Sequence, residues 1–451
     1  MYVVVIGLGE VGRHVVRTLE WEKHDVVAVD VDQHAIDAVE ENHDVMTLQG
    51  YGASQRVLGQ AEVEKADLVV AVTNNDEVNL IAALAARNMG AKRSVARVQG
   101  SEWSGSAASE TPTAIQYGLL GVDVVFNPRV LLAQEIAKIA QSHGALEVLD
   151  LANDRIEVVQ LELGEQGRML NKPIAKLPLP RQVLVAAVVR DGTLFVPGGT
   201  DMLLPRDRIY LVGLPEHMVE AEDLFTHKTE ARRVCIVGGG VIGQALARML
   251  LDADVEVMII EQNGARAQKL AEVLPNATVV HGDGTDLTLL KEQKVGSYDL
   301  FAAVSHEDEV NLMAGLLAKR VGVARTVSVV HRPDYGEIYR QLGIDVVLSP
   351  RTVASDHVLR YCRQTELQSL TVLEGGQAEI LELVTQEGSR IADTPVRRLA
   401  MPRGALLAAI LKGDRVVIPR GDDVVAIGDT VVVLSTPAAR KGVARLFRGR
   451  R

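Results

Sequence analysis

The chain has 451 residues, a length that predicts about three domains at roughly 150 residues each. Its 59 acidic and 48 basic side chains give a net charge of −11, which disfavours general nucleic-acid binding. The 2 Trp, 8 Tyr and 5 Phe are too few for base-stacking or sugar-binding surfaces, and the 2 Cys, without a CxxC spacing, exclude a disulfide scaffold and a cysteine-based zinc site.

The N-terminal segment VVVIGLGEVG is a run of β-branched residues that leads into a glycine loop and an amphipathic helix. In this strand–turn–helix context the GxGxxG pattern is the dinucleotide-binding fingerprint. The first glycine permits the turn, the second lets the backbone approach a pyrophosphate, and the third allows close helix–strand packing. The helix N-terminus then offers unpaired N–H groups to the phosphates. We therefore expect a cofactor-binding loop at Gly7, Leu8, Gly9, Glu10, Val11 and Gly12.

An acidic residue, Asp30, ends the next predicted strand, 18 residues after Gly12. A carboxylate at this place accepts hydrogen bonds from a ribose diol and repels a 2′-phosphate. The sequence therefore favours NAD(H) over NADP(H). Glu10 adds negative charge beside the phosphates, which disfavours a bare triphosphate.

Polar side chains follow the later strands of this domain. Thr73 and Asn74 come after the run LVVAV, where a doubly wound sheet receives its ligand. They are expected to bond a ribose or phosphate, to cap the helix that begins at DEVNL, or to do both. Arg97 ends the next strand and is a candidate phosphate ligand, and Tyr51 lies in an earlier turn, GYGAS. The acids of DEVNL are expected in the first helical turn, where the helix dipole favours them.

The order of these patterns predicts the domain organisation of the first half. Residues 1–125 alternate short apolar strands with amphipathic helices, which predicts an α/β Rossmann-like domain with a doubly wound parallel sheet. A helix within 126–145 follows, and it could cross to a partner subunit. Residues 146–227 show alternating strands and turn signals, which indicate a small α+β domain with a largely antiparallel sheet.

The whole pattern then repeats along the chain. VVVIGLGEVG recurs as VCIVGGGVIG at an offset of 231, and later segments recur at offsets of 232 and 222. The predicted units are a second Rossmann-like domain at 232–348, a second crossover helix at 349–366 and a second small domain at 367–451. The chain is therefore a tandem duplication with four domains, more than the length alone suggests.

The second half carries its own candidate site with two differences. Val329 stands where the first half has Arg97, and Asp283 stands over Tyr51. Asp283 is expected either to bond an adenosine or to belong only to a Gly-Asp-Gly turn. The candidate cofactor-binding residues of this half are Gly238, Gly239, Gly240, Val241, Ile242, Gly243, Glu261, Asp283, Ser305 and His306.

Neither half shows a catalytic or metal-binding pattern. The eleven histidines form no HExxH or other ligand-spaced cluster, no GxSxG is present, and no substrate domain follows either glycine loop. His281, His306 and His331, near strand ends, are expected to be structural or solvent-facing. The last residues, ARKGVARLFRGRR, carry six basic groups and no acid, so they form either a frayed soluble terminus or a contact with an anionic membrane or acidic partner.

With these paired loops, the sequence resembles the RCK (regulator of potassium conductance) family, in particular the cytosolic NAD-binding subunits of Trk-type potassium uptake systems. The resemblance rests on GLGEVG and GGGVIG, on Asp30 and Glu261, on the paired AVTNNDEVN and AVSHEDEVN segments, on ARV at 96–98, and on the small domain after each nucleotide domain. It covers essentially the whole chain.

The resemblance implies a regulatory protein that is not an enzyme and binds no metal at its nucleotide sites. It implies that NAD(H), with ATP or ADP as further candidates, binds both Rossmann-like domains and gates a membrane-embedded Trk-type potassium channel subunit. It also implies a homo-oligomeric ring, with a tetramer as the expected size, that lies in the cytoplasm against the inner face of the cell membrane. The absence of an arginine at Val329 leaves the ligand of the second site open.

Two other functions remain open from the residues alone. One is an NAD-dependent dehydrogenase with two nucleotide domains, which turnover of NADH with a substrate would reveal. The other is a nucleotide-sensing adaptor for a different transporter, which co-purification with a membrane channel would distinguish.

Overall fold

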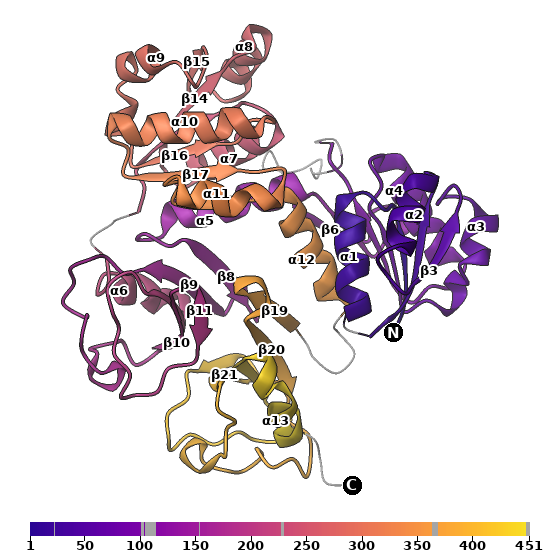
Figure 1. Ribbon diagram of the computed structural model, residues 1–451, viewed down its shortest axis with the longest axis vertical. Helices are drawn as coiled ribbons and strands as arrows, with labels where there is room; N and C mark the ends of the chain where they lie inside the picture. Colours follow the sequence, from indigo (N-terminus) through magenta and orange to yellow (C-terminus); the bar gives the residue numbers. More distant parts are fainter. Residues whose placement is uncertain are drawn as a thin grey trace. The chain divides into compact units, whose positions relative to one another are not determined.

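The computed structural model describes residues 1–21, 23–100, 103, 114–152, 154–226, 230–362 and 369–447 (Figure 1). The chain divides into two compact units, one made of Met1–Ala137 and Ala231–Cys362 and the other of Lys138–Glu230 and Arg363–Arg451. The first unit holds both α/β domains and the second holds both small domains. In the described part of the chain, no helix has the length and apolar character that a membrane span requires.

The first α/β domain is built on a seven-stranded sheet with the order β3-β2-β1-β4-β5-β7-β6. All of its strand pairs are parallel except β6 with β7. Its strands are β1 (Tyr2–Ile6), β2 (Asp25–Asp30), β3 (Met46–Gln49), β4 (Leu68–Ala71), β5 (Ser94–Arg97), β6 (Ile115–Tyr117) and β7 (Val124–Phe126). Its helices are α1 (Glu10–Trp21), α2 (Gln33–Glu40), α3 (Gln55–Gln60) and α4 (Asp76–Asn88).

Helices cover both faces of this sheet, which explains why its central strands are almost wholly apolar. Val3 and Val5 of β1 pack into a core with α1 and α2, whereas Val4 and Ile6 of the same strand pack into a core with α3 and α4. The alternation of side chains along a strand produces these two cores. The order of the strands reverses direction between β1 and β4, and this switch point is where such sheets bind ligands.

The second α/β domain repeats this arrangement with six parallel strands in the order β15-β14-β13-β16-β17-β18. The strands are β13 (Arg233–Val237), β14 (Glu256–Glu261), β15 (Thr278–His281), β16 (Leu300–Ala303), β17 (Arg325–Val329) and β18 (Val346–Leu348). The helices are α7 (Val241–Asp252), α8 (Gly264–Val273), α9 (Leu287–Glu292), α10 (Asp308–Val321) and α11 (Gly336–Gln341). The tandem α/β fold predicted from the sequence is confirmed.

A long helix follows each α/β domain: α5 (Pro128–Gln141) and α12 (Pro350–Cys362). The sequence analysis expected such a helix to cross to a partner subunit, but α12 crosses to the other half of the same chain. It lies along α1, as Figure 1 shows in orange against indigo. Ala354, Val358 and Leu359 of α12 are buried in one core with Val11 and Val15 of α1. Duplication thus places within one chain a contact that a single-copy protein would make with a second subunit.

The small domains both contain a five-stranded antiparallel sheet, as the sequence predicts. The first sheet has the order β11-β10-β12-β9-β8 and the second the order β19-β20-β23-β21-β22. The first domain contains β8 (Glu147–Leu151), β9 (Ile156–Glu162), β10 (Val183–Arg190), β11 (Thr193–Phe195), β12 (Arg208–Gly213) and α6 (Met218–Glu222). The second contains β19 (Ser369–Leu373), β20 (Ala378–Val384), β21 (Ala405–Lys412), β22 (Arg415–Val417), β23 (Thr430–Ser435) and α13 (Pro437–Phe447).

These two sheets pack on each other within the second unit. Ile156, Tyr210 and Val212 of the first small domain share a core with Ile380 and Val432 of the second. At its edge the Glu374 carboxylate accepts hydrogen bonds from Gln160, Arg208 and Tyr210 in the list of polar contacts across the pair. The small domains therefore bury their apolar faces against each other.

The basic C-terminal segment is in part an ordered helix, which corrects the expectation of a frayed terminus. Val443, Leu446 and Phe447 of α13 are buried against the second small sheet. Arg440, one of the six basic residues, pairs with Glu379 at 3.3 Å. Residues 448–451, which carry the other arginines after Arg445, lie outside the described residues.

Candidate nucleotide-binding sites

Each α/β domain has a cavity at the carboxyl ends of its central strands. The first cavity, about 390 Å³, lies between the glycine loop after β1 and the loop after β4. The second cavity, about 820 Å³, lies at the equivalent place between β13 and β16. Both volumes fall in the range of small-molecule sites. Both cavities occupy the switch point of the sheet, where the sequence analysis expects the cofactor.

The three glycines of the first loop meet the three constraints of the fingerprint. Gly7 has a φ of +97°, and a Cβ on it would lie 2.6 Å from the Thr73 amide nitrogen. A Cβ on Gly12 would lie 1.8 Å from the Gly7 carbonyl oxygen, so only glycine allows α1 to start so close to β1. A Cβ on Gly9 would meet nothing within 4 Å, because this residue faces the open cavity.

The second glycine loop has the same geometry. Gly238 has a φ of +101°, and a Cβ on Gly243 would lie 1.9 Å from the Gly238 carbonyl oxygen. Gly240, like Gly9, has open space where a side chain would begin. Both loops therefore keep the backbone geometry that pyrophosphate binding needs.

The predicted acids end β2 and β14, and each one holds its glycine loop. Asp30 accepts a hydrogen bond from the Leu8 amide at 2.5 Å and another from the Asp32 amide at 2.9 Å. Glu261 accepts one from the Gly239 amide and one from the Asn263 amide, each at 2.7 Å. The Asp30 side chain is half-buried and lines its cavity, whereas Glu261 is only 4% exposed.

The loop after β4 is built around the buried amide of Asn79. Its oxygen accepts hydrogen bonds from the Thr73 amide and hydroxyl, and its nitrogen donates to the Thr73 and Arg97 carbonyls. Asn75, and neither Thr73 nor Asn74, caps α4 by accepting from the Val78 amide. Thr73 and Asn74 therefore line the cavity without serving as the helix cap. Asn311 holds Ser305 in the same way in the second domain.

Arg97 lies behind this loop. Its guanidinium donates to the Thr73 carbonyl at 2.7 Å and to the Asn74 side-chain oxygen at 3.1 Å. The residue is 9% exposed, does not line the first cavity, and its burial lowers the pKa of the guanidinium. This geometry suits a positioning residue for Thr73 and Asn74 better than the phosphate ligand that the sequence analysis expects.

Most of the expected residues lie at a cavity wall. In the first domain these are Gly7, Gly9, Asp30, Tyr51, Thr73 and Asn74. In the second domain they are Gly238, Gly239, Gly240, Val241, Ile242, Glu261, Asp283, Ser305 and His306. Leu8 and Val11 are buried in the core, and neither Gly12 nor Gly243 lines a cavity. These four belong to the sites through their backbone and packing.

Glu10 forms an ion pair with Arg351, at the start of α12. Arg351 offsets part of the negative charge that Glu10 brings to the first glycine loop. The argument against a triphosphate at this site is weaker for that reason. The pair also connects the loop to the helix that arrives from the other half.

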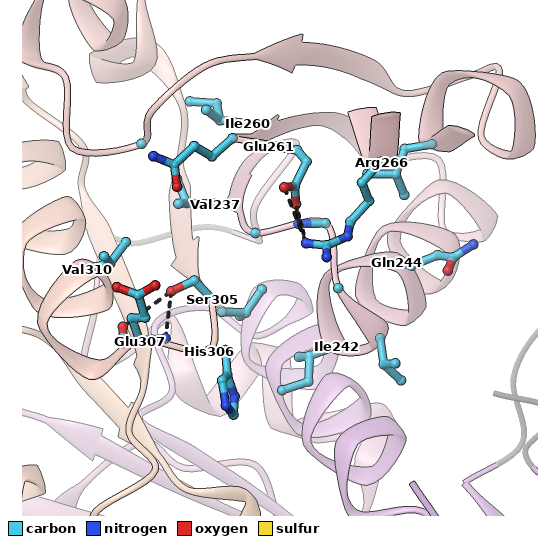
Figure 2. A pocket seen from close by; sticks show the side chains of 18 of the residues that line it. Val237, Ile242, Gln244, Ile260, Glu261, Arg266, Ser305, His306, Glu307 and Val310 are labelled. Atoms are coloured by element: carbon cyan, nitrogen blue, oxygen red, sulfur yellow. Dashed lines mark hydrogen bonds and ion pairs between the residues drawn. The ribbon is translucent and has the colours of Figure 1, made fainter. Parts of the chain in front are cut away.

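The second cavity has cationic side chains that sequence reasoning missed. Arg266 and Lys269 of α8 line it, and Arg129 at the start of α5 reaches it from the first half of the chain. Arg266 pairs with Glu261 at 3.3 Å, as the dashed lines of Figure 2 show. A search for basic residues one helical turn after the strand-end acid could have found Arg266 and Lys269. The sequence gives no comparable signal for Arg129, which depends on the path of α5.

The histidines expected to be structural or solvent-facing divide into two groups. His306 and His331 both line the second cavity, with ring centroids 5.0 Å apart. His331 also lies 2.9 Å from the Asp308 carboxylate, which accepts its backbone amide as well. His281 is exposed, with a ring nitrogen 3.1 Å from the Gln262 carbonyl.

Asp283 shows both features that the sequence left open. It lines the second cavity, and it also accepts hydrogen bonds from the amide and hydroxyl of Thr285 in a local turn. Within the described ranges of the chain, no group of three His, Cys, Asp or Glu side chains is placed to hold a metal ion.

Comparison with known proteins agrees with this duplicated geometry. A curated relative of similar length is the Trk system potassium uptake protein TrkA homolog 1 of Methanosarcina mazei, 34% identical over 99% of this chain and 100% of its own length. The Trk system potassium uptake protein TrkA of Vibrio alginolyticus is 30% identical over 96% of this chain and 95% of its own. A solved structure described as the GsuK channel bound to NAD superposes with a TM-score of 0.62 at 18% identity, over 99% of this chain and 78% of that one.

The domain families match both halves. The TrkA-N domain matches residues 3–128 and 234–350, which are the two α/β domains with their cavities. The TrkA-C domain matches residues 158–226 and 380–448, within the two small domains. The order N–C–N–C and the full-length relatives lead to one conclusion: the chain belongs to the TrkA family of Trk potassium uptake proteins.

Proposed function

We propose that this chain is the cytosolic regulatory subunit of a potassium uptake system, in which it binds NAD(H) and gates a membrane-embedded channel subunit. The observation that carries the proposal is the duplicated cavity at the sheet switch point, with a glycine loop on one side and a strand-end acid on another. The printed names of the relatives support the potassium system, and the NAD bound to GsuK supports the ligand.

A regulatory role fits the first cavity better than catalysis does. The described residues that line it include no His, Cys, Lys or Arg, and its titratable side chains are Asp30 and Tyr51. Asp30 is already engaged by two backbone amides of the loop and its surroundings. A dehydrogenase needs an acid or base beside the reacting carbon, together with groups that orient a substrate. These side chains supply a nucleotide site without such a set.

The contact between α12 and α1 suggests how nucleotide binding becomes movement. α1 begins at the first glycine loop, and its Glu10 is paired with Arg351 of α12. A nucleotide that changes the loop changes the charge and position that α12 meets. A ligand shifts such an equilibrium only by the difference between its affinities for the two states. We infer that NAD+, NADH, ATP and ADP act through such differences, in a homo-oligomeric ring at the inner face of the membrane.

Calorimetric titration of the full-length protein with each of these four nucleotides tests the ligand part. We expect NADH to bind, and we expect Asp30→Ala to weaken it because the ribose contact is lost and the Leu8 and Asp32 amides lose their acceptor. Gly9→Asp should abolish binding at the first site, since it places a carboxylate where the pyrophosphate would lie and meets no steric clash. Unchanged binding in both variants would remove this cavity from the proposal.

Two further measurements test the regulatory part. Incubation of the protein with NADH and candidate substrates should give no turnover, and steady turnover would favour the dehydrogenase instead. Isolation of the tagged protein from its native membrane fraction should yield a potassium channel subunit in a nucleotide-dependent amount. Recovery of a different transporter would favour the adaptor.

A further inference from the structure

The two halves differ in charge at one end of the cavity. At the same offset of 231 residues, Asp32 is replaced by Asn263, Ala35 by Arg266 and Ala38 by Lys269. In both halves these positions lie at the start of the helix that follows the strand-end acid, α2 or α8. In dinucleotide-binding sheets this is where the adenosine ribose lies. The first half offers it two carboxylates, and the second half offers one carboxylate and two cations.

The carboxylate of the second half faces away from a ligand. Glu261 is 4% exposed, and its two oxygens accept the Gly239 and Asn263 amides. The Arg266 guanidinium lies 3.3 and 3.4 Å from the same two oxygens. Its negative charge is therefore compensated, and little of its surface is left for a ribose diol.

The cations, by contrast, remain accessible. The side chain of Arg266 is 53% exposed, and Figure 2 shows it beside the glycine loop and opposite Glu261. Lys269, one turn further along α8, is exposed and lines the same cavity. In the first domain the equivalent alanines bring no charge, and the cap residue Asp32 adds a second carboxylate two residues after Asp30.

We propose that the second site binds a dinucleotide with a phosphate on the 2′ position of its adenosine ribose, the NADP(H) class, while the first site binds NAD(H). An arginine near the strand-end acid accommodates a 2′-phosphate, whereas exposed carboxylates repel one. The second cavity, about 820 Å³ against about 390 Å³, also has the room. The inference rests on the proposed function, because it assumes that both cavities are nucleotide sites.

The experiment isolates each site in the full-length protein. Gly9→Asp blocks the first site and Gly240→Asp the second, and neither new Cβ meets an atom within 4 Å. Each variant is titrated by calorimetry with NADH and NADPH, and then with ADP, ATP and adenosine 2′,5′-bisphosphate as smaller probes. The last probe carries only the additional ribose phosphate, so it separates that contact from a general attraction for phosphate.

With the first site blocked, we expect NADPH to bind at least about tenfold more tightly than NADH, and adenosine 2′,5′-bisphosphate more tightly than ADP. Adding Arg266→Ala and Lys269→Ala should remove this preference and leave NADH binding nearly unchanged. With the second site blocked, NADH should be preferred, and the triple change Asp32→Asn, Ala35→Arg and Ala38→Lys should move the first site toward NADPH.

Three results would overturn the inference. Equal affinity for NADH and NADPH at the second site would show that the cations do not recognise a ribose phosphate. A gain for ATP over ADP without a gain for the 2′,5′-bisphosphate would assign them to a triphosphate chain. Absence of binding of every nucleotide at the second site would overturn this inference, and absence at both sites would overturn the proposed function as well.

Discussion

At the scale of the residue, one asparagine side chain in each half holds the loop that faces the cavity. Asn79 is completely buried, and all of its polar atoms are used to join the ends of β4 and β5. Replacing it with leucine would leave the Thr73 amide and the Thr73 and Arg97 carbonyls without partners. Each buried group left unpaired costs about 1–3 kcal/mol. We therefore predict that Asn79→Leu destabilises the first α/β domain by about 3 kcal/mol or more.

The measurement is the thermal unfolding of the full-length protein, followed by NADH titration of the folded variant. The midpoint of the domain's transition should fall by about 5 °C or more, and NADH affinity should fall because Thr73 loses its position. Asn42→Ala is a matched control, since Asn42 is exposed and makes one hydrogen bond to the Ala38 carbonyl. Equal stability of the two variants would contradict this role for Asn79.

At the scale of the element, the helix that follows each α/β domain was predictable but its destination was not. The proline at its start and its amphipathic sequence indicate where the helix begins, and α5 and α12 lie within the expected ranges. Its packing partner depends on the path of the chain, which no local pattern encodes. For this reason the sequence predicted the glycine loops and strand-end acids of both halves, but not that Arg351 would pair with Glu10 or that Arg129 would line the second cavity.

A substitution in α12 tests whether its contact with α1 is a structural necessity. Val358 is completely buried in the core that contains Val11 and Val15 of α1. Val358→Asp would place a carboxylate there without a partner, and we predict a loss of about 3–5 kcal/mol in the stability of the first unit. Thermal unfolding and limited proteolysis of the full-length protein should both report it. Thr352→Asp, which adds the same charge at an exposed position of α12, should change stability by no more than about 0.5 kcal/mol.

At the scale of the whole molecule, duplication explains both what the sequence reveals and what it conceals. The offsets of 231 to 222 residues identify two copies of one design, which the structure confirms strand by strand. The copies have diverged where they face ligands, as at Ala35 and Arg266, and not where they form cores. Each half also buries apolar surface against the other, a property that the sequence of one half cannot show.

This mutual burial leads to a prediction for the isolated first half, residues 1–226. Without the second half, Val11 and Val15 lose the cover of α12, and Ile156 and Tyr210 lose the facing sheet of the other small domain. Exposed apolar surface of this extent drives association. A second copy of the first half carries α5, the counterpart of α12, so it can cover the same surface.

We therefore predict that the isolated first half is a dimer, with each copy taking the place of the missing half. Size-exclusion chromatography with light scattering should give twice the mass of the fragment across the micromolar range. Val11→Asp in the fragment should shift it toward monomer or aggregate, because the charge lies in the surface that α5 of the second copy must cover. A fragment that stays monomeric and unfolds cooperatively would show that each half completes its own core, and the packing of α12 on α1 would then be a convenience of the duplicated chain and not a requirement of the fold.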